Sequence, residues 1–207
     1  AAHRGDELLG DLADALMIGG QNKKAITLYP LSIDTYRNVL DETPTYTIAK
    51  KFLAGALYGL SIAEGRLDQS TSSERLSECI ELRRAVVAKA PSNNGFAREL
   101  MVALARAGET KEALEIAERQ LAEFPEDGGV LYKVANAFAL LSATDDGNQF
   151  GDRAIAALQM AIDNGHTGLA LMAIDPDLAP IHDREDFKSL IAGSQTEPAG
   201  GVVGALP

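Results

Sequence analysis

LADALMIGGQNKKAITLY, residues 12–29, is the stretch of sequence that decides the fold. Its large and small apolar residues are spaced three or four positions apart on either side of a glycine pair, which indicates two amphipathic helices joined by a tight turn. Small residues at regular positions let two helices approach closely, while large residues fill the space between them. The pattern is carried by Leu12, Ala13, Leu16, Gly20, Ala25 and Tyr29.

The same arrangement of a small residue followed three positions later by a large one recurs along the chain, as Gly55 with Tyr58, Met101 with Leu104, and Ala135 with Phe138. The spacing from the small residue to the one opening the second helix is 12 in the first and third units, but 24 and 19 in the second and fourth. Polar loops account for the longer spacings. Prolines, which end helices, close units at Pro44, Pro91 and Pro125, and the last two are 34 residues apart.

This order of residues and the 34-residue period resemble the tetratricopeptide repeat family over roughly residues 6–165. The resemblance implies an all-α fold, an α-α superhelix of about four helix pairs followed by a C-terminal helical cap. Pro30 lies inside the second expected helix, which it should kink or break. The helices are expected at 6–19, 23–42, 46–64, 73–90, 94–107, 111–124, 128–143 and 149–164, with short ones near 168–173 and 184–192.

A second resemblance covers residues 154–191, AIAALQMAIDNGHTGLALMAIDPDLAPIHDREDFKSLI. This segment is similar to the end of tetratricopeptide regions attached to bacterial serine/threonine protein kinases, and would make the chain a fragment of a larger protein. No kinase signature occurs in the chain itself. The matching positions are Ala157, Leu158, Ala161, Gly165, Asp175, Pro176, Asp177, Leu178, Pro180, Ile181 and Phe187.

Read from its residues alone, the same segment predicts a cap from about residue 166. Asp175 or Asp177 can accept backbone amide hydrogens at the start of a short helix, and Pro180 limits its length. Leu178, Ile181, Phe187, Leu190 and Ile191 would then cover the apolar end of the last helix pair. Residues 1–192 are therefore expected to form one helical-repeat domain, and 193–207 a Gly/Pro-rich tail lying on its own solenoid or on a neighbouring copy.

Composition narrows the possible partners. The 207 residues are 46% apolar but only 5% aromatic, without tryptophan, which favours closely packed helices. A net charge of −11 argues against nucleic acid as a partner, because phosphate binding needs clustered Lys and Arg. No run of 18 apolar residues occurs, so no membrane contact is expected, and the compartment stays unknown with the cytoplasm favoured.

No pattern in the sequence predicts catalysis, a metal or a cofactor. His3, His166 and His182 are far apart and lack ligand spacing. Cys79 stands at the small position of a second helix, where a buried thiol acts as a small hydrophobe. Residues 145–148, DDGN, resemble half a calcium loop but lack its closing glutamate, so a polar turn is expected. The chain is therefore expected not to be an enzyme.

The repeat family presents the first helix of each unit on a concave face, which implies a peptide-binding groove. Arg98 and Arg106 lie two helical turns apart and would grip a peptide carboxylate, with Asn136 adding an amide. The alternative pairs these arginines with Glu99 or Glu109 on the surface. The expected groove consists of Phe52, Leu60, Arg98, Val102, Arg106, Tyr132, Asn136 and Leu140.

The predicted function is a protein–protein interaction scaffold that binds a peptide or protein segment in this groove. Two alternatives stay open from the sequence. One is a homo-oligomeric assembly module, with self-association possible through the C-terminal tail. The other is a regulatory appendage of a serine/threonine kinase.

Overall fold

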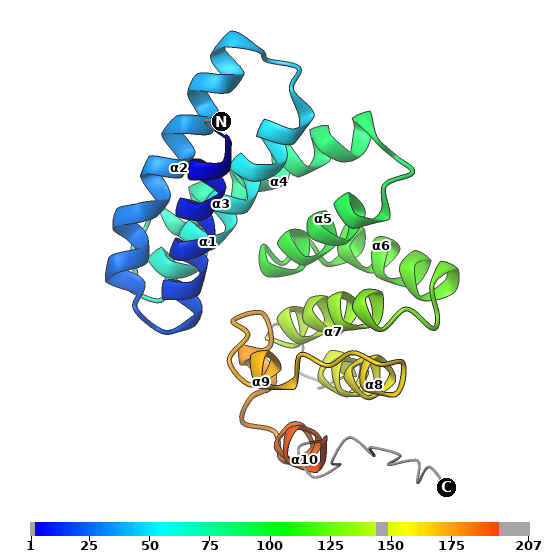
Figure 1. Ribbon diagram of the computed structural model, residues 1–207. Helices are drawn as coiled ribbons and strands as arrows, with labels where there is room; N and C mark the ends of the chain where they lie inside the picture. Colours follow the sequence, from blue (N-terminus) through cyan, green and yellow to red (C-terminus); the bar gives the residue numbers. More distant parts are fainter. Residues whose placement is uncertain (1–2, 144–148, 195–207) are drawn as a thin grey trace, which may run out of the picture.

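The computed structural model describes residues 3–143 and 149–194, and every regular element within these ranges is helical (Figure 1). The expected all-α fold is confirmed. None of the helices in these ranges is both long and apolar enough to cross a bilayer. The elements are α1 (His3–Ile18), α2 (Asn22–Glu42), α3 (Thr47–Gly65), α4 (Ser72–Lys89), α5 (Asn94–Arg106), α6 (Thr110–Glu123), α7 (Gly128–Ser142), α8 (Gln149–Asp163), α9 (Leu169–Met172), the 3-10 helix η1 (Ala179–Ile181) and α10 (Glu185–Ser194).

Pro30 does not end the second helix, so the expectation of a break is wrong. Helix α2 runs from Asn22 to Glu42 with Pro30 inside it. Proline removes one helical hydrogen bond and costs about 3 kcal/mol in a helix interior. Tyr29, Ile33 and Tyr36 lie on both sides of it and are buried, and α2 packs against α1 and α3. Burial of these side chains offsets the local cost and keeps the helix continuous.

Three turns share one glycine-based geometry at the ends of α1, α5 and α8. Gly20, Gly108 and Gly165 have φ angles of +75°, +75° and +83°, a left-handed conformation that costs other residues energy. After Gly20, the amide of Gln21 donates to the carbonyl of Leu16 at 2.7 Å, which closes a Schellman motif. This chemistry produces the short reversals that keep consecutive helices antiparallel.

Two helices begin with the same side-chain cap, 34 residues apart. The Oδ1 atom of Asn93 accepts from the amide of Gly95 at 3.0 Å, at the start of α5. Likewise, Oδ1 of Asp127 accepts from the amides of Gly129 and Val130, both at 2.9 Å, at the start of α7. Each cap satisfies amides that have no partner within the first helical turn.

The helices stack as pairs around one continuous core. Helix α1 packs on α3, and α5 packs on α7, while α2, α4 and α6 each contact the helix that follows. Fully buried small residues mark the crossings, among them Ala13, Ala25, Cys79 and Ala113. In the described residues, α3 and α5 do not pack on each other in the way that α1–α3 and α5–α7 do, so the stack opens between the second and third pairs (Figure 1).

The chain after α8 first crosses the concave face and then covers the last pair. Met172, Leu178, Ile181, Phe187 and Ile191 are buried there, and η1 packs on α7 while α10 packs on α8 and α9. The capping residues predicted from sequence therefore do enter the core, with Leu190 packed against it. The predicted polar turn at 145–148 and the tail from 195 onward lie outside the described residues.

Candidate functional site: a strapped cleft on the concave face

A short segment between α9 and η1, residues 175–178, crosses the concave face, and we call it the strap. Its first residue, Asp175, accepts the backbone amide of Asp177 at 2.8 Å through Oδ1, which fixes the turn. The other oxygen, Oδ2, accepts from the hydroxyl of Tyr132 and from Nδ2 of Asn136, the latter at 3.2 Å. Both partners lie on α7, so Asp175 ties the strap to the fourth helix pair.

Asp177 ties the strap to the second and third pairs. Its Oδ1 atom accepts from the Tyr58 hydroxyl at 2.6 Å and from Nη2 of Arg106, which also donates to the carbonyl of Pro176 at 3.1 Å. Burial raises the pKa of the Asp177 carboxyl, but the charges of Arg106 and Lys133 and the two side-chain hydrogen bonds outweigh it and hold this pKa below its ordinary value. Asp177 is therefore a buried, ionised carboxylate.

Tyr58, at the centre of α3, joins the two halves of the stack. The guanidinium carbons of Arg83 and Arg106 lie 4.6 Å and 5.4 Å from the centre of its ring. Nε of Arg106 donates to the Tyr58 hydroxyl at 2.9 Å. Burial, above all, raises the pKa of Tyr58 well above its usual value, so the phenol stays protonated and donates to Asp177.

Beside the strap a cleft of about 410 Å³ stays open between the first two helix pairs and the last described elements. One wall comes from α1 and α3, and the opposite wall from α7, α9 and the loop before α9. Aromatic, apolar and charged groups alternate around it. The lining residues include Asp14, Met17, Ile18, Tyr58, Arg83, Tyr132, Lys133, His166, Leu171, Asp175 and Asp177.

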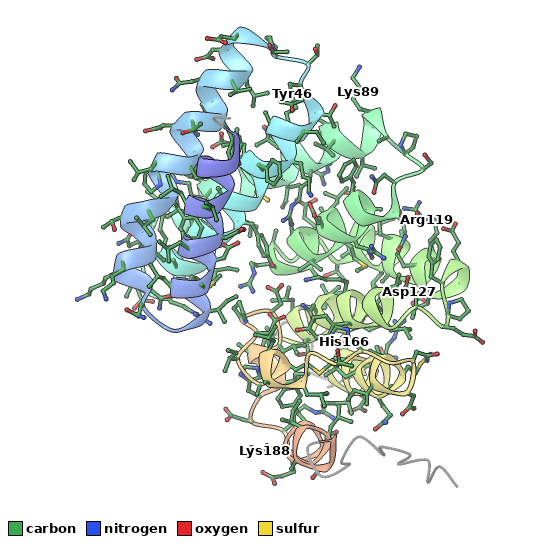
Figure 2. All side chains as sticks on the ribbon, viewed as in Figure 1. Tyr46, Lys89, Arg119, Asp127, His166 and Lys188 are labelled. Carbon is green, nitrogen blue, oxygen red and sulfur yellow. The ribbon has the colours of Figure 1, made fainter. Side chains whose placement is uncertain are left out.

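The wall formed by α7 carries an aromatic stack beside a lysine. The rings of Tyr132 and His166 are stacked with centres 4.4 Å apart, and Nζ of Lys133 lies 5.7 Å from the centre of the Tyr132 ring. Burial and the Lys133 charge lower the pKa of His166, which is therefore neutral at pH 7. Figure 2 shows His166 beside α7 and α8.

A second hollow of about 650 Å³ lies on the other side of Pro176. It is bounded by the end of α3, the start of α4 and the end of α5. Its lining combines the serines Ser61, Ser72, Ser73 and Ser77 with apolar residues such as Ile62, Leu76 and Ile80. The hydroxyl of Ser72 is already used in a hydrogen bond to the carbonyl of Ser61 at 2.8 Å. The strap thus separates two hollows of different character.

The structure brings together only part of the predicted groove. Arg106, Tyr132 and Asn136 meet at the strap, but they hold the chain's own aspartates. Arg98, at the other end of α5, lines neither hollow and shows no ion pair among the described residues, so the pairing with Glu99 or Glu109 is absent there too. Phe52 stacks on Tyr36 at 5.4 Å, away from the strap.

The remaining apolar members of the predicted groove, Leu60, Val102 and Leu140, are 3%, 4% and 8% exposed and belong to the core. None of the three lines either hollow. The repeat resemblance implies that these positions face the concave side, but it does not take into account the strap or the close packing of neighbouring helices.

Most residues of the cleft were not predicted as site residues, among them Tyr58, Arg83, Lys133 and His166. Tyr58 was assigned to a helix crossing, and Arg83 stands in a second helix, outside the face that the repeat pattern marks. Arg83 is 7% exposed, and a polar residue at a buried helix position was the one available signal. Asp175 and Asp177 of the strap were predicted to be helix caps. No spacing in the sequence indicated that they would bond to side chains of other helices.

Nothing in the cleft favours metal or thiol chemistry. Among residues 3–143 and 149–194, no group of three or more His, Cys, Asp or Glu side chains has metal-binding geometry. Cys79 is fully buried at its helix crossing, and burial raises the pKa of its thiol. A protonated, inaccessible thiol is a packing residue and not a nucleophile.

Comparison with known proteins relates the middle of the chain to a transcription factor domain. The family model described as the bacterial transcriptional activator domain (BTAD) matches residues 56–123, about a third of the chain. These residues form the second half of α3 and all of α4, α5 and α6. They include Tyr58, Arg83 and Arg106, but not α7 or the strap. No curated protein and no solved structure matches the chain.

This match corrects the prediction about nucleic acid and bears on the predicted kinase resemblance. The net charge suggested that nucleic acid is not a partner, and the match contradicts that exclusion, because transcriptional activators act at DNA. The net charge of a helical region does not by itself exclude nucleic acid as a partner. The comparisons give no support to the kinase resemblance of residues 154–191. The middle third of the chain is thus similar to a helical domain that bacteria use in transcriptional activation, and nothing in its description indicates catalysis.

Proposed function

We propose that this helical repeat is the interaction module of a bacterial transcriptional regulator and that it binds a protein segment in the cleft beside the strap. The cleft itself is the observation that carries the proposal. It is open, it measures about 410 Å³, and it lies on the concave side of the stack. A volume of this size accommodates a few side chains of an extended or helical segment.

The chemistry of the walls supports a protein ligand. Tyr58 and Tyr132 supply aromatic surface, while Met17, Ile18 and Leu171 supply apolar surface. Leu171 is 61% exposed in the unbound protein, so its side chain is available at the rim. Aromatic anchors surrounded by polar groups are typical of protein interaction sites.

The transcriptional part of the proposal rests on the BTAD match to residues 56–123. Those residues build one wall of the cleft through α3 and α4, so the region similar to the activator domain contributes directly to the binding surface. The opposite wall consists of α7 and α9, so a ligand in the cleft contacts helices from both ends of the stack. Such a module recruits or senses a partner protein.

Selection of peptides from a displayed random library against the purified protein tests the proposal. Binding of the selected peptides is measured by fluorescence anisotropy for the wild type, for Leu171→Asp and for Leu31→Asp. Leu31 on α2 is similarly exposed, at 51%, but does not line the cleft, so it is the matched control. We expect Leu171→Asp to weaken binding about tenfold or more and Leu31→Asp to leave it unchanged. Equal affinities for the three proteins would refute the cleft as the binding site.

A further inference from the structure

The charged groups in the cleft fall into two sets, and the first set is already satisfied within the protein. Asp14 accepts from the hydroxyl of Tyr29 at 2.6 Å. Asp175 accepts from the Tyr132 hydroxyl, the Asn136 amide and the backbone amide of Asp177. Asp177 accepts from the Tyr58 hydroxyl and the Arg106 guanidinium. Each of the three carboxylates that line the cleft therefore has at least one internal donor, and Asp177 also has a full cationic partner in Arg106.

The second set consists of two cations that keep unused donors. Arg83 spends Nη1 on the backbone carbonyl of Glu99, and its buried Nε has no acceptor in the described part of the chain. It faces no carboxylate within ion-pair distance among those residues, although it is 7% exposed. A guanidinium carries five donors, so most of its hydrogen-bonding capacity is free. Burying a cation without a counter-charge costs free energy. The position of Arg83 beside the Tyr58 ring therefore indicates that its counter-charge comes from a ligand.

Lys133 is the second cation. Its ammonium group makes no hydrogen bond or ion pair with any residue in 3–143 or 149–194, and its nearest recorded contact is the face of the Tyr132 ring. Its charge lowers the pKa of both Asp177 and His166, which shows that it acts on the strap side of the cleft. Lys133 is half-buried and lines the cleft together with Arg83.

We infer that the cleft recognises an acidic segment of a partner protein, in which an aspartate or glutamate lies next to a large apolar side chain. This inference rests on the proposed function and names the ligand class. The carboxylate pairs with Lys133 and with the unused N–H groups of Arg83, while the apolar neighbour packs against Met17, Ile18 and Leu171. A segment without a carboxylate would leave the free donors of Arg83 and Lys133 unpaired.

The positive charge of Arg83 and Lys133 contrasts with the negative net charge of the whole protein. The chain carries a net charge of −11, so an acidic partner is repelled by most of its surface. Binding at the cleft therefore needs the short-range cations and is selective against acidic segments that lack the apolar neighbour. Neutral His166 adds stacking surface without adding charge.

Three pools of nine-residue peptides test the inference. The pools have identical leucine and phenylalanine content and differ at one position, which is Glu in the first pool, Gln in the second and Lys in the third. Affinities are measured by fluorescence anisotropy for the wild type, Lys133→Met and Lys89→Met. Lys89 is exposed at the end of α4, does not line the cleft, and lies far from His166 in Figure 2, so it serves as the charge-matched control. We expect the Glu pool to bind about tenfold more tightly than the Gln pool at low salt, with Lys133→Met alone removing this preference.

The outcomes separate the two proposals. If the Gln pool binds as tightly as the Glu pool and Lys133→Met changes nothing, the cleft still takes protein segments but the acidic preference is wrong. If the Glu preference survives Lys133→Met but falls with Lys89→Met, acidic peptides bind elsewhere and the site is wrong. Arg83→Lys, which keeps the charge but loses the planar donors, is expected to reduce the Glu preference partly, and its fold is checked by circular dichroism. Failure of every pool to bind would overturn the proposed function together with this inference.

Discussion

At the scale of single residues, one glycine decides how closely two helices approach. A Cβ atom built on Gly59 of α3 would lie 2.6 Å from Cζ of Tyr29 and 2.7 Å from Oδ1 of Asp14. Tyr29 is fully buried and hydrogen-bonded to Asp14, so neither group can withdraw without loss. Gly55, one turn earlier on α3, has no heavy atom within 4 Å of the same built position. The two glycines therefore have opposite roles in one helix.

Gly59→Ala should destabilise the protein by about 1–3 kcal/mol through overpacking against Tyr29. Gly55→Ala should instead stabilise it by about 0.5–1 kcal/mol, because alanine restricts the unfolded chain and favours helix. Urea unfolding followed by circular dichroism measures both. A stabilising Gly59→Ala would show that α3 and α2 are not packed as closely as described.

The charge on Asp177 predicts a pH dependence of stability. Its folded pKa lies below its unfolded value of 3.8, so the unfolded state binds protons more readily as the pH falls. The carboxylate stabilises the fold fully above about pH 5, and this contribution disappears as the pH drops through the folded pKa. Asp177→Asn should cost about 1–3 kcal/mol at pH 7 and progressively less below about pH 4.

Urea unfolding of the wild type and Asp177→Asn between pH 7 and pH 3 measures this difference. Taking the difference between the two proteins cancels other titrating groups, including Asp14, whose pKa is raised mainly by burial and which acts in the opposite direction. A gap in unfolding free energy that stays constant down to pH 3 would mean that Asp177 is not ionised in the folded state.

Sequence reasoning found the charged residues of the site only in part. Arg106 was predicted to grip a peptide carboxylate and Asn136 to add an amide contact. In the structure both residues bond to carboxylates, which belong to Asp177 and Asp175 of the same chain. Local spacing reports which residues share a helix face. It says nothing about a segment that returns from 71 residues away to occupy that face.

At the scale of helices, sequence reasoning was most successful, because the signals are local. The expected bounds of the eight long helices agree with the structure to within about three residues, since caps and glycine turns mark the ends. Pro30 is the exception, where tertiary burial around α2 overrides a local rule. The splaying of the stack between α3 and α5 was not predicted, because the inserted residues 66–71 give a loop length and no direction.

The cap at Asp127 predicts a measurable share of helix stability. Asp127→Ala removes the acceptor for two amides at the start of α7 and should lower the unfolding free energy by about 1 kcal/mol. Asp127→Ser keeps an acceptor oxygen and should recover most of the loss. Chemical denaturation of the three proteins provides the comparison, and equal stabilities of the alanine and serine variants would exclude a capping role.

At the scale of the whole molecule, the strap changes how the stack holds together. Repeat proteins are stabilised mainly by contacts between neighbouring units. Here one short segment bonds to Tyr58 of α3, Arg106 of α5, and Tyr132 and Asn136 of α7, and so connects three units at once. It also spans the place where α3 and α5 separate. The strap should therefore couple the first two pairs to the rest.

The double variant Asp175→Ala, Asp177→Ala tests this coupling. Hydrogen–deuterium exchange should show faster exchange in α1–α4 than in α5–α8, because the first pairs can then open without the others. In the wild type we expect the two regions to exchange at similar free energies. Uniform acceleration across α1–α8 would indicate that neighbour contacts alone provide the coupling.

The bond between Tyr58 and Asp177 also has a consequence for the order in which the protein acquires its shape during synthesis. The two residues are 119 positions apart, whereas most contacts in a helical stack are local. The ribosome therefore releases α1 to α8 before the segment that finishes the cleft exists, and Arg106 spends that interval without its partner. A nascent chain that ends before residue 175 would keep α1 to α8 yet present an open concave face, so the cleft is completed only after these helices have been made.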